Sequence, residues 1–288
     1  MRILILGGDG MLGHQLLKQL SSRHDVRVTL RRDLENYSKH RLFNDKNAYA
    51  GIDLRDFSRV SKVCEDLGPE VVINAAGVLK QRQDASDVIL NLEINSLLPH
   101  RLASLCHDLT ARLVHLSTDC IFSGKKGNYC ETDFSDAEDL YGRSKYLGEV
   151  HANNCLTLRT SMIGRELSRK TNLLEWFLSQ QGVIKGYKNA IFSGFTSSEL
   201  ARIIENIITY FPNSSGLYHV SSDPISKLDL FLRLKTLLGL NVQIETEENV
   251  HCDRSLNSAK FRTEFNYTPP IWDDMLSELA AEINRIRP

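Results

Sequence analysis

The chain has 288 residues, of which 42% are hydrophobic and 25% are charged, so it is long enough to bury one large core. Its 35 Lys and Arg residues nearly balance its 36 Asp and Glu residues, and the formal net charge is -1. This balance excludes the overall basic field that attracts nucleic acid or an anionic membrane surface, so we expect neither as a partner.

The cysteines and the N-terminus indicate where the protein resides. The six cysteines form no C-x-x-C pair and have no metal-site spacing with histidine, which argues against disulfides and against a bound metal. The apolar run that begins at Met1 ends after Leu6, which is too short for a signal peptide or a membrane span. We therefore expect a cytoplasmic protein with reduced thiols and no metal site.

In the first half of the chain, short apolar runs alternate with helical patterns. This alternation is typical of βα units that wind into a parallel sheet with both faces buried. The pattern predicts an α/β protein with a Rossmann-type, doubly wound parallel sheet. We expect strands over residues 2–6, 26–30, 70–74, 113–117 and 156–160, and helices over 12–20, 97–109 and 141–151.

The alternation stops after residue 161. Residues 162–191 mix charged, aromatic and glycine residues without a clear period. Residues 198–208 have the pattern of an amphipathic helix and 217–220 that of a strand, and we expect both to return to the sheet. Further helices are expected at 227–238 and 272–286.

These patterns divide the chain into two parts. Residues 1–161 plus 192–220 are expected to form the sheet domain. Residues 162–191 plus 221–288 are expected to form a small, mostly C-terminal cap. No linker is long enough to separate two independently folding units.

A glycine-rich segment lies directly between the first strand and the first helix. It spaces three glycines as G-x-x-G-x-x-G over residues 7–13. One glycine permits a tight turn, one lets backbone amides approach a pyrophosphate, and one allows close packing of helix and strand. Glycines also serve ordinary turns, so it is the position between strand and helix that favours a dinucleotide site. We predict that the cofactor is bound here by Gly7, Gly10, Met11, Leu12 and Gly13.

The end of the second strand indicates which dinucleotide is bound. A carboxylate there favours a free ribose 2′-hydroxyl, whereas an arginine accommodates a 2′-phosphate. This chain has Arg31 and Arg32, which favours NADP(H); NAD(H) is the alternative, because solvated arginine pairs are common at strand ends. Residues that follow two other strands are also expected at the cofactor: Asp53, Leu54, Ala75, Ala76 and Gly77.

Tyr141 and Lys145 lie four residues apart and therefore on one face of the helix expected at 141–151. The pKa of a phenol is about 10, and a neighbouring ammonium lowers it, which helps the phenol to protonate a nascent alkoxide. Thr118 follows the strand 113–117, at the sheet edge where ligands of such folds bind, and its hydroxyl is placed to hydrogen-bond a substrate oxygen. A tyrosine and a lysine on one helix are common, so the interpretation depends on their combination with Thr118 and the glycine segment.

Four segments together resemble the extended short-chain dehydrogenase/reductase family, and within it the branch like dTDP-4-dehydrorhamnose reductase. They are residues 7–13, 117–124, 127–131 and 141–149. The resemblance implies an NAD(P)H-dependent 4-reductase of a nucleotide-linked 4-keto-6-deoxy sugar, in deoxysugar or surface polysaccharide biosynthesis. It also implies that the cap binds a UDP-, dTDP- or GDP-linked sugar. A homodimer through helices at 97–109 and 141–151 is the assembly that it suggests.

The resemblance also assigns roles to residues. It implies Thr118, Tyr141 and Lys145 as the catalytic triad, with Asn95 in support. Arg254 lies in a segment like the arginine-containing substrate segment of the family, and a guanidinium is well matched to a diphosphate. The other residues that we expect at the substrate are Asp119 and Lys185.

Cys120 departs from the pattern of this branch, in which an aromatic residue commonly follows the Thr-Asp pair. In related enzymes that resemble GDP-fucose synthase, a cysteine at this place acts as an acid or base, paired with a histidine or lysine. Cys120 with Lys185 therefore keeps a second hypothesis open, a bifunctional C3/C5 epimerase and 4-reductase. A cysteine that only fills space, and a non-catalytic NADP-binding regulatory subunit, are the other interpretations.

Overall fold

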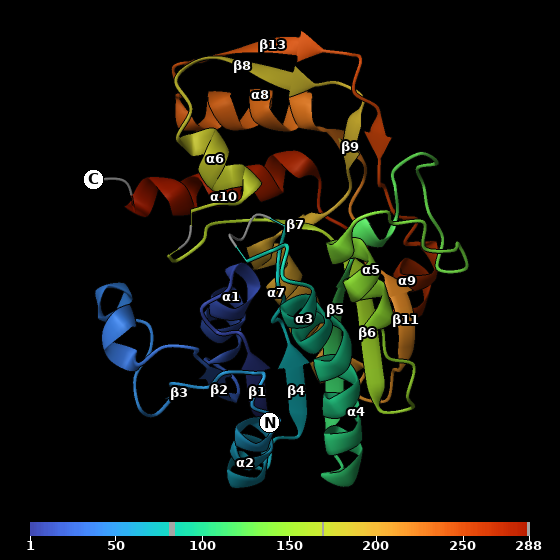
Figure 1. Cartoon of the computed structure of the whole chain (residues 1–288). Coiled ribbons are helices and arrows are strands. Elements are labelled where there is room, and N and C mark those ends of the chain that lie inside the picture. Colours follow the sequence, from blue (N-terminus) through green and yellow to red (C-terminus); the bar gives the residue numbers. More distant parts are fainter. Residues whose placement is uncertain (81–83, 169, 287–288) are drawn as a thin grey trace.

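A parallel sheet of seven strands forms the centre of the protein. The computed structural model describes residues 1–80, 84–168 and 170–286. The strand order is β11-β6-β5-β4-β1-β2-β3, and every neighbouring pair is parallel. This order confirms the predicted Rossmann-type fold (Figure 1). The strands are β1 (Arg2–Leu6), β2 (Asp25–Thr29), β3 (Ala48–Tyr49), β4 (Val71–Asn74), β5 (Arg112–Thr118), β6 (Cys155–Thr160) and β11 (Gly216–His219).

Helices cover both faces of this sheet because its strands are apolar on both sides. In β1, Ile3 and Ile5 belong to one cluster of buried side chains, and Leu4 and Leu6 belong to another. The helices α1 and α7 contribute to the first cluster, and α2 and α4 contribute to the second (Figure 1). Their bounds are α1 (Met11–Leu20), α7 (Ser197–Tyr210), α2 (Phe57–Leu67) and α4 (Leu98–Asp108).

Two helices differ in length from the sequence prediction. The helix expected at 97–109 begins earlier, because α3 (Val88–Asn91) leads through the π-helical turn η2 (Leu92–Leu97) into α4. The helix expected at 141–151 is α5 (Leu140–Leu147) and ends before the predicted residue. After α5, Gly148 passes so close to Asn95 that an added Cβ would overlap the Asn95 carbonyl. Two short helical turns, η1 (Leu34–His40) and η3 (Asp119–Ile121), complete this part.

Most of the remaining elements gather beyond one end of the sheet, at the top of Figure 1. The helices α8 and α10 cover the residues predicted from the sequence, and α9 lies beside β11. We propose to describe residues 162–191 plus 221–288 as the cap and residues 1–161 plus 192–220 as the dinucleotide-binding domain. The elements are β7 (Met162–Ile163), α6 (Leu173–Leu178), β8 (Gly182–Tyr187), β9 (Ala190–Phe192), β10 (Phe195–Thr196), β12 (Ile225–Ser226), α8 (Lys227–Leu238), β13 (Val242–Glu247), β14 (Cys252–Asp253), α9 (Ala259–Glu264) and α10 (Trp272–Ile286).

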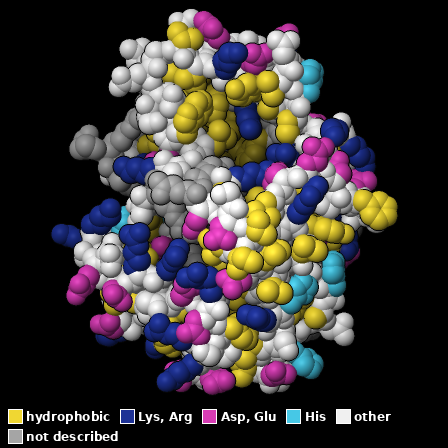
Figure 2. Space-filling model, viewed as in Figure 1, with side chains coloured by type: hydrophobic (Ala, Val, Ile, Leu, Met, Phe, Trp, Pro, Cys, Tyr) yellow, Lys and Arg dark blue, Asp and Glu magenta, His cyan; other side chains and the backbone are white. Residues whose placement is uncertain are grey.

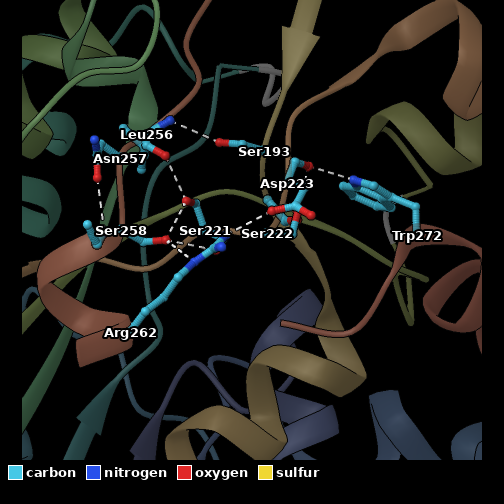
Figure 3. A network of polar contacts seen from close by, with 11 residues as sticks. Ser193, Ser221, Ser222, Asp223, Leu256, Asn257, Ser258, Arg262 and Trp272 are labelled. Atoms are coloured by element: carbon cyan, nitrogen blue, oxygen red, sulfur yellow. Dashed lines mark hydrogen bonds and ion pairs between the residues drawn. The ribbon is translucent and has the colours of Figure 1, made fainter. Parts of the chain in front are cut away.

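The two parts share one core and are joined by hydrogen bonds. Leu234 of α8 and Met275 of α10 belong to the same buried cluster as the side chains of α1 and α7. Figure 3 shows the polar junction between the two parts, where Leu256 N in the cap donates to Ser193 Oγ at 3.0 Å. Ser222 Oγ, also in the cap, donates to Gly194 O at 2.6 Å. These bonds join the cap to the sheet domain.

No helix in the described part of the chain is long and apolar enough to cross a membrane. Over the same residues, no group of three or more His, Cys, Asp or Glu side chains is arranged to hold a metal ion. The six cysteines are all free thiols.

A buried ion pair joins β6 to the segment that follows α5. Arg159 Nη2 lies 2.7 Å from Glu149 Oε2, and the two side chains are only 3% and 2% exposed. Ser117 Oγ donates to Glu149 Oε1 at 2.6 Å. His219 Nδ1 lies 2.8 Å from Tyr129 O and therefore carries the ring proton, so that Nε2 accepts from Arg159 at 3.1 Å. Burial, reinforced by Arg159, lowers the pKa of His219 to about 3, which keeps the ring neutral.

Removal of one member of this pair is expected to cost more stability than removal of both. Arg159→Met leaves the Glu149 carboxylate buried without its partner and is expected to lower the free energy of unfolding by about 3–5 kcal/mol. The double variant with Glu149→Met leaves no buried charge and is expected to recover part of this loss. Urea unfolding followed by circular dichroism measures both variants. A double variant less stable than the single one would contradict this account.

Candidate functional site

A cavity of about 480 Å³ opens between the sheet and the cap, where Figure 2 shows the molecule hollowed. Residues that follow β1, β2, β4, β5 and β6 line it, as expected for ligand sites at the carboxyl edge of a doubly wound sheet. Of the residues predicted from the sequence, Gly13, Arg32, Asn95 and Lys185 are not part of the lining. Those that line it are Gly7, Gly10, Met11, Leu12, Arg31, Asp53, Leu54, Ala75, Ala76, Gly77, Thr118, Asp119, Cys120, Tyr141, Lys145 and Arg254.

The glycine segment forms a cradle at the start of α1. Gly7 has a φ of 83°, a left-handed conformation that other residues rarely adopt. A Cβ on Gly13 would overlap the carbonyl of Gly7, and a Cβ on Gly8 would overlap the side chain of Val28. Gly10 precedes α1, and no side chain among the described residues caps the first amides of the helix. The first backbone amides of the helix can donate to a pyrophosphate, and the glycines let it approach them closely. The residues present therefore suit a dinucleotide.

The charged residues at the ends of β2 and β3 interact with one another. Asp53 Oδ2 lies 2.5 Å from Arg55 Nη2. Hydrogen bonds from Arg55 lower the pKa of Asp53 to about 2, and the charge of Arg31 contributes in the same direction. Arg31 lines the cavity, whereas Arg32 does not. Of the two predicted arginines, only Arg31 is thus placed to meet a ribose phosphate.

The hydroxyl groups of Thr118 and Tyr141 interact at the floor of the cavity. Burial raises the pKa of Tyr141 above its ordinary value and the Cys120 thiol adds to this effect, while the hydrogen bond with Thr118 opposes it. The sequence predicted that Lys145 lowers this pKa, whereas burial is the largest cause of the shift and the charges of Asp119 and Asp139 also raise the pKa. Gly142 brings α5 close, because a Cβ there would overlap the carbonyl of Cys120.

Lys145 is buried beneath the cavity and is directed at β5. Its Nζ donates to Leu116 O at 2.6 Å, and the residue is only 4% exposed. Burial lowers the pKa of Lys145 to about 8, and the charge of Glu149 opposes this shift. The side chain therefore changes charge close to neutral pH.

Asn95 positions the helix that carries Tyr141. Its Oδ1 accepts from Val78 N at 2.9 Å, and its Nδ2 donates to Ser144 Oγ at 3.1 Å. Ser144 Oγ in turn donates to Tyr141 O at 2.9 Å. Asn95 belongs to the π-helical turn η2, and such turns are frequent at functional sites. The resemblance implied a supporting role for Asn95. These hydrogen bonds give it that role by positioning α5, and not by contact with the substrate.

Lys80 and Asp139 are two residues of the site that the sequence did not predict. Lys80 lines the cavity, and its Nζ lies 2.6 Å from Asp139 Oδ2 and 5.7 Å from the ring centroid of Tyr141. Asp139 also caps α5 by accepting from Gly142 N at 2.9 Å. The segment after β4 is thereby tied to the start of the helix. No motif or periodicity marks Lys80, and only its place after the turn 75–77 pointed to the cavity.

Cys120 has its thiol in an environment that disfavours the thiolate. Burial raises the pKa of Cys120 to about 12, and the neighbouring Asp119 adds to this, while Lys80 and Arg254 oppose it. A cysteine that acts as a base needs a lowered pKa, because the thiolate is the reactive form. Lys185, the partner expected from the sequence, lies on β8 with its side chain 65% exposed and pairs with Glu247 at 2.9 Å. The structure does not bring Lys185 to Cys120.

Arg254 from the cap and Asp119 from the end of β5 both line the cavity. Arg254 is half-buried, and its Nε donates to Phe122 O at 2.7 Å, which leaves the other guanidinium nitrogens for a ligand. Asp119 is buried, and burial raises the pKa of its carboxyl group while the charge of Arg254 opposes the shift. The pair therefore places a guanidinium beside the reacting residues.

Residues 1–284 match the family described as RmlD substrate binding domain. The chain belongs to this family. It is 27% identical over 241 residues to a dTDP-4-dehydrorhamnose reductase of Aggregatibacter actinomycetemcomitans, which covers 77% of this chain and 74% of that protein. It is also 27% identical over 179 residues to methionine adenosyltransferase 2 subunit beta of Bos taurus, which covers 58% of this chain and 48% of that protein.

A solved structure shows the same fold as this member of the RmlD family. It is a dTDP-4-dehydrorhamnose reductase of Bacillus anthracis in complex with NADP, with a TM-score of 0.79 and 22% sequence identity. The match covers 98% of this chain and 99% of that chain. The likeness therefore extends over the sheet and the cap together.

Lys145→Met is expected to stabilise this RmlD family protein at neutral pH. The folded-state pKa of about 8 lies below the ordinary value of 10.5, so at pH 7 the fold bears the cost of a buried charge. This cost decreases as the pH rises from about 8 to about 10.5, because the unfolded chain binds the extra proton there. We expect a gain of about 1–3 kcal/mol in the free energy of unfolding at pH 7, measured with urea. The gain is expected to shrink at pH 10, and a loss of stability at pH 7 would contradict the cost of burial.

Proposed function

We propose that this chain is an NAD(P)H-dependent 4-reductase of a nucleotide-linked 4-keto-6-deoxy sugar, with NADP(H) favoured. The observation that carries the proposal is that Thr118, Tyr141 and Lys145 line the same cavity as the glycine cradle. A relative that is named dTDP-4-dehydrorhamnose reductase supports a dTDP-linked substrate and a place in deoxysugar or surface polysaccharide biosynthesis.

The side chains of the site handle the proton in this reaction. When bound, the reduced nicotinamide supplies a hydride for C4 of the sugar. Tyr141 holds its proton firmly because burial raises its pKa, and it gives up that proton when a strongly basic alkoxide develops on O4. The Thr118 hydroxyl interacts with Tyr141 and orients the same oxygen. Lys145, with a pKa of about 8, supplies positive charge beneath the site at neutral pH.

The nucleotide part of the substrate is assigned to the side of the cavity that the cap covers. Arg254 has guanidinium nitrogens that are not used by its bond to Phe122, and a guanidinium binds diphosphate well. Lys227, at the start of α8, lines the same cavity and adds a second cation. We therefore place the diphosphate between these two residues and the sugar over Tyr141.

Specific observations bear on the two alternative functions, the bifunctional epimerase and the regulatory subunit. The bifunctional epimerase is disfavoured, because the pKa of Cys120 is raised to about 12 and Lys185 is not in the cavity. The regulatory-subunit hypothesis gains support from the similarity to methionine adenosyltransferase 2 subunit beta. The chain spans less than half of that protein, at 48%, and the presence of Thr118, Tyr141 and Lys145 in one cavity favours the reductase.

Oxidation of NADPH by a panel of UDP-, dTDP- and GDP-linked 4-keto-6-deoxy sugars tests the proposal. Tyr141→Phe removes the proton donor and is expected to lower kcat by about 10²–10⁴-fold with little change in KM. Tyr146→Phe is the matched control, because Tyr146 lies on the same helix with 43% of its surface exposed. Native turnover by Tyr141→Phe would contradict the proton-donor role. No oxidation of NADPH by any of these sugars, with dinucleotide bound, would favour a regulatory subunit.

We infer that the reaction takes place in the cytoplasm and that the enzyme acts as a homodimer. The six free cysteines fit a reducing compartment. Exposed apolar side chains gather over α3, η2 and α5, as Figure 2 shows. A second copy of the same face would bury them around a twofold axis. These side chains are Val88, Ile89, Leu97, Tyr146 and Leu147.

A charge in this apolar face is expected to prevent dimer formation. Leu147, which is 58% exposed, becomes Glu in one variant, and Val183 on β8, which is 55% exposed, becomes Glu in the control. Light scattering during gel filtration gives the mass of each. We expect a dimer for the native protein and the control, and a monomer for Leu147→Glu. A native monomer would overturn the assembly, with no consequence for the catalytic residues.

A further inference from the structure

Asp9 is an acidic residue within the glycine segment that lines the cavity. It stands between Gly8 and Gly10, and none of the roles described above uses it. The hydroxyl of Tyr37 donates to Asp9 Oδ2 at 3.0 Å. Tyr37 belongs to η1 and is only 4% exposed, so it offers a rigid partner. A buried tyrosine of the next βα unit thus holds this carboxylate in one place.

The glycine segment is fastened to the end of β2 next to Asp9. Gly7 N donates to Thr29 Oγ1 at 3.2 Å, and Gly8 N donates to Thr29 O at 2.9 Å. Arg32 N donates to the Tyr37 hydroxyl at 3.4 Å, so the same hydroxyl touches both Asp9 and the backbone just beyond β2. In folds of this kind, the end of the second strand is where the adenosine ribose of the dinucleotide lies. The Asp9 carboxylate therefore lies beside the strand end at which the ribose of a bound dinucleotide would be found, although it comes from a different part of the chain.

The positive charge at this end of the cavity is partly neutralised. Arg31 acts on Asp53, whose pKa it helps to lower, and Asp53 is also paired with Arg55. Asp9, Arg31, Asp53 and Arg55 all line the cavity, so two carboxylates stand beside two guanidinium groups. A 2′-phosphate would meet a site of nearly balanced charge rather than an arginine cluster.

We propose that Asp9 sets the cofactor choice of this chain by accepting a hydrogen bond from a free ribose 2′-hydroxyl and by repelling a 2′-phosphate. The inference rests on the proposed function, since it requires that the cavity holds a nicotinamide dinucleotide. Arg31 attracts the 2′-phosphate and Asp9 opposes it. Asp9 therefore narrows the preference for NADPH over NADH that Arg31 confers.

Direct binding measures this choice without any sugar substrate. Titration with NADH and NADPH, followed by nicotinamide fluorescence, gives the ratio of the two dissociation constants for each variant. AMP and adenosine 2′,5′-bisphosphate, which differ only by the 2′-phosphate, repeat the comparison without the nicotinamide when followed by calorimetry. Asp9→Asn keeps the size of the side chain and its ability to accept from Tyr37, and it removes the charge. Asp33→Asn is the matched control, because Asp33 is exposed near the same strand end and does not line the cavity.

Asp9→Asn is expected to shift the ratio towards NADPH by about tenfold, as when one charge repulsion at a partly buried site is removed. Asp33→Asn is expected to leave the ratio unchanged, and Arg31→Ala is expected to shift it towards NADH. An unchanged ratio in Asp9→Asn, with tight binding of both dinucleotides, would overturn the role of Asp9 and leave the proposed function intact. Failure of the native protein to bind either dinucleotide would overturn both.

Discussion

The buried ion pair between Arg159 and Glu149 is the constraint on which the geometry of the site depends. Two charged side chains with almost no exposure are stable only where each has several hydrogen-bonding partners. The loss of hydration costs more free energy than a single ion-pair contact supplies. Ser117 on β5 and His219 on β11 supply these partners. Three neighbouring strands and the end of α5 must therefore meet at one place. This requirement fixes the position of the helix that carries Tyr141 and Lys145.

Close approach of the backbone then sets the catalytic residues in position. Gly142 permits α5 to contact the chain at Cys120, and Gly148 permits it to contact η2 at Asn95. Any side chain at either glycine would move the helix away from the end of β5. Tyr141 and Thr118 therefore interact at the floor of the cavity, and burial holds the proton of Tyr141 until the reaction needs it. The contacts that stabilise the fold of this protein therefore also position its catalytic residues.

The sequence predicted the helices α8 and α10 and every strand of the central sheet except β3, because buried strands and amphipathic helices leave a periodic pattern. The short strands outside this sheet were not predicted. It could not predict the end of α5 at Leu147, since the burial of Glu149 depends on Arg159 in the next strand. Contacts between distant segments also explain the other differences. Lys185 was predicted as a partner of Cys120, and the fold places it on β8, where it pairs with Glu247. Lys80 was missed because it belongs to no motif. Asp9 stands at a variable position inside the glycine segment, and only the folded chain shows its contact with Tyr37 at the cavity.

The central claim is that this chain moves hydride from a nicotinamide to C4 of a nucleotide-linked keto-sugar. The most direct measurement is the reaction with NADPH that carries deuterium at the transferable position, followed by NMR of the sugar product. The account predicts one deuterium at C4 and none at C3 or C5. Absence of deuterium at C4 in a reaction that yields product would contradict it.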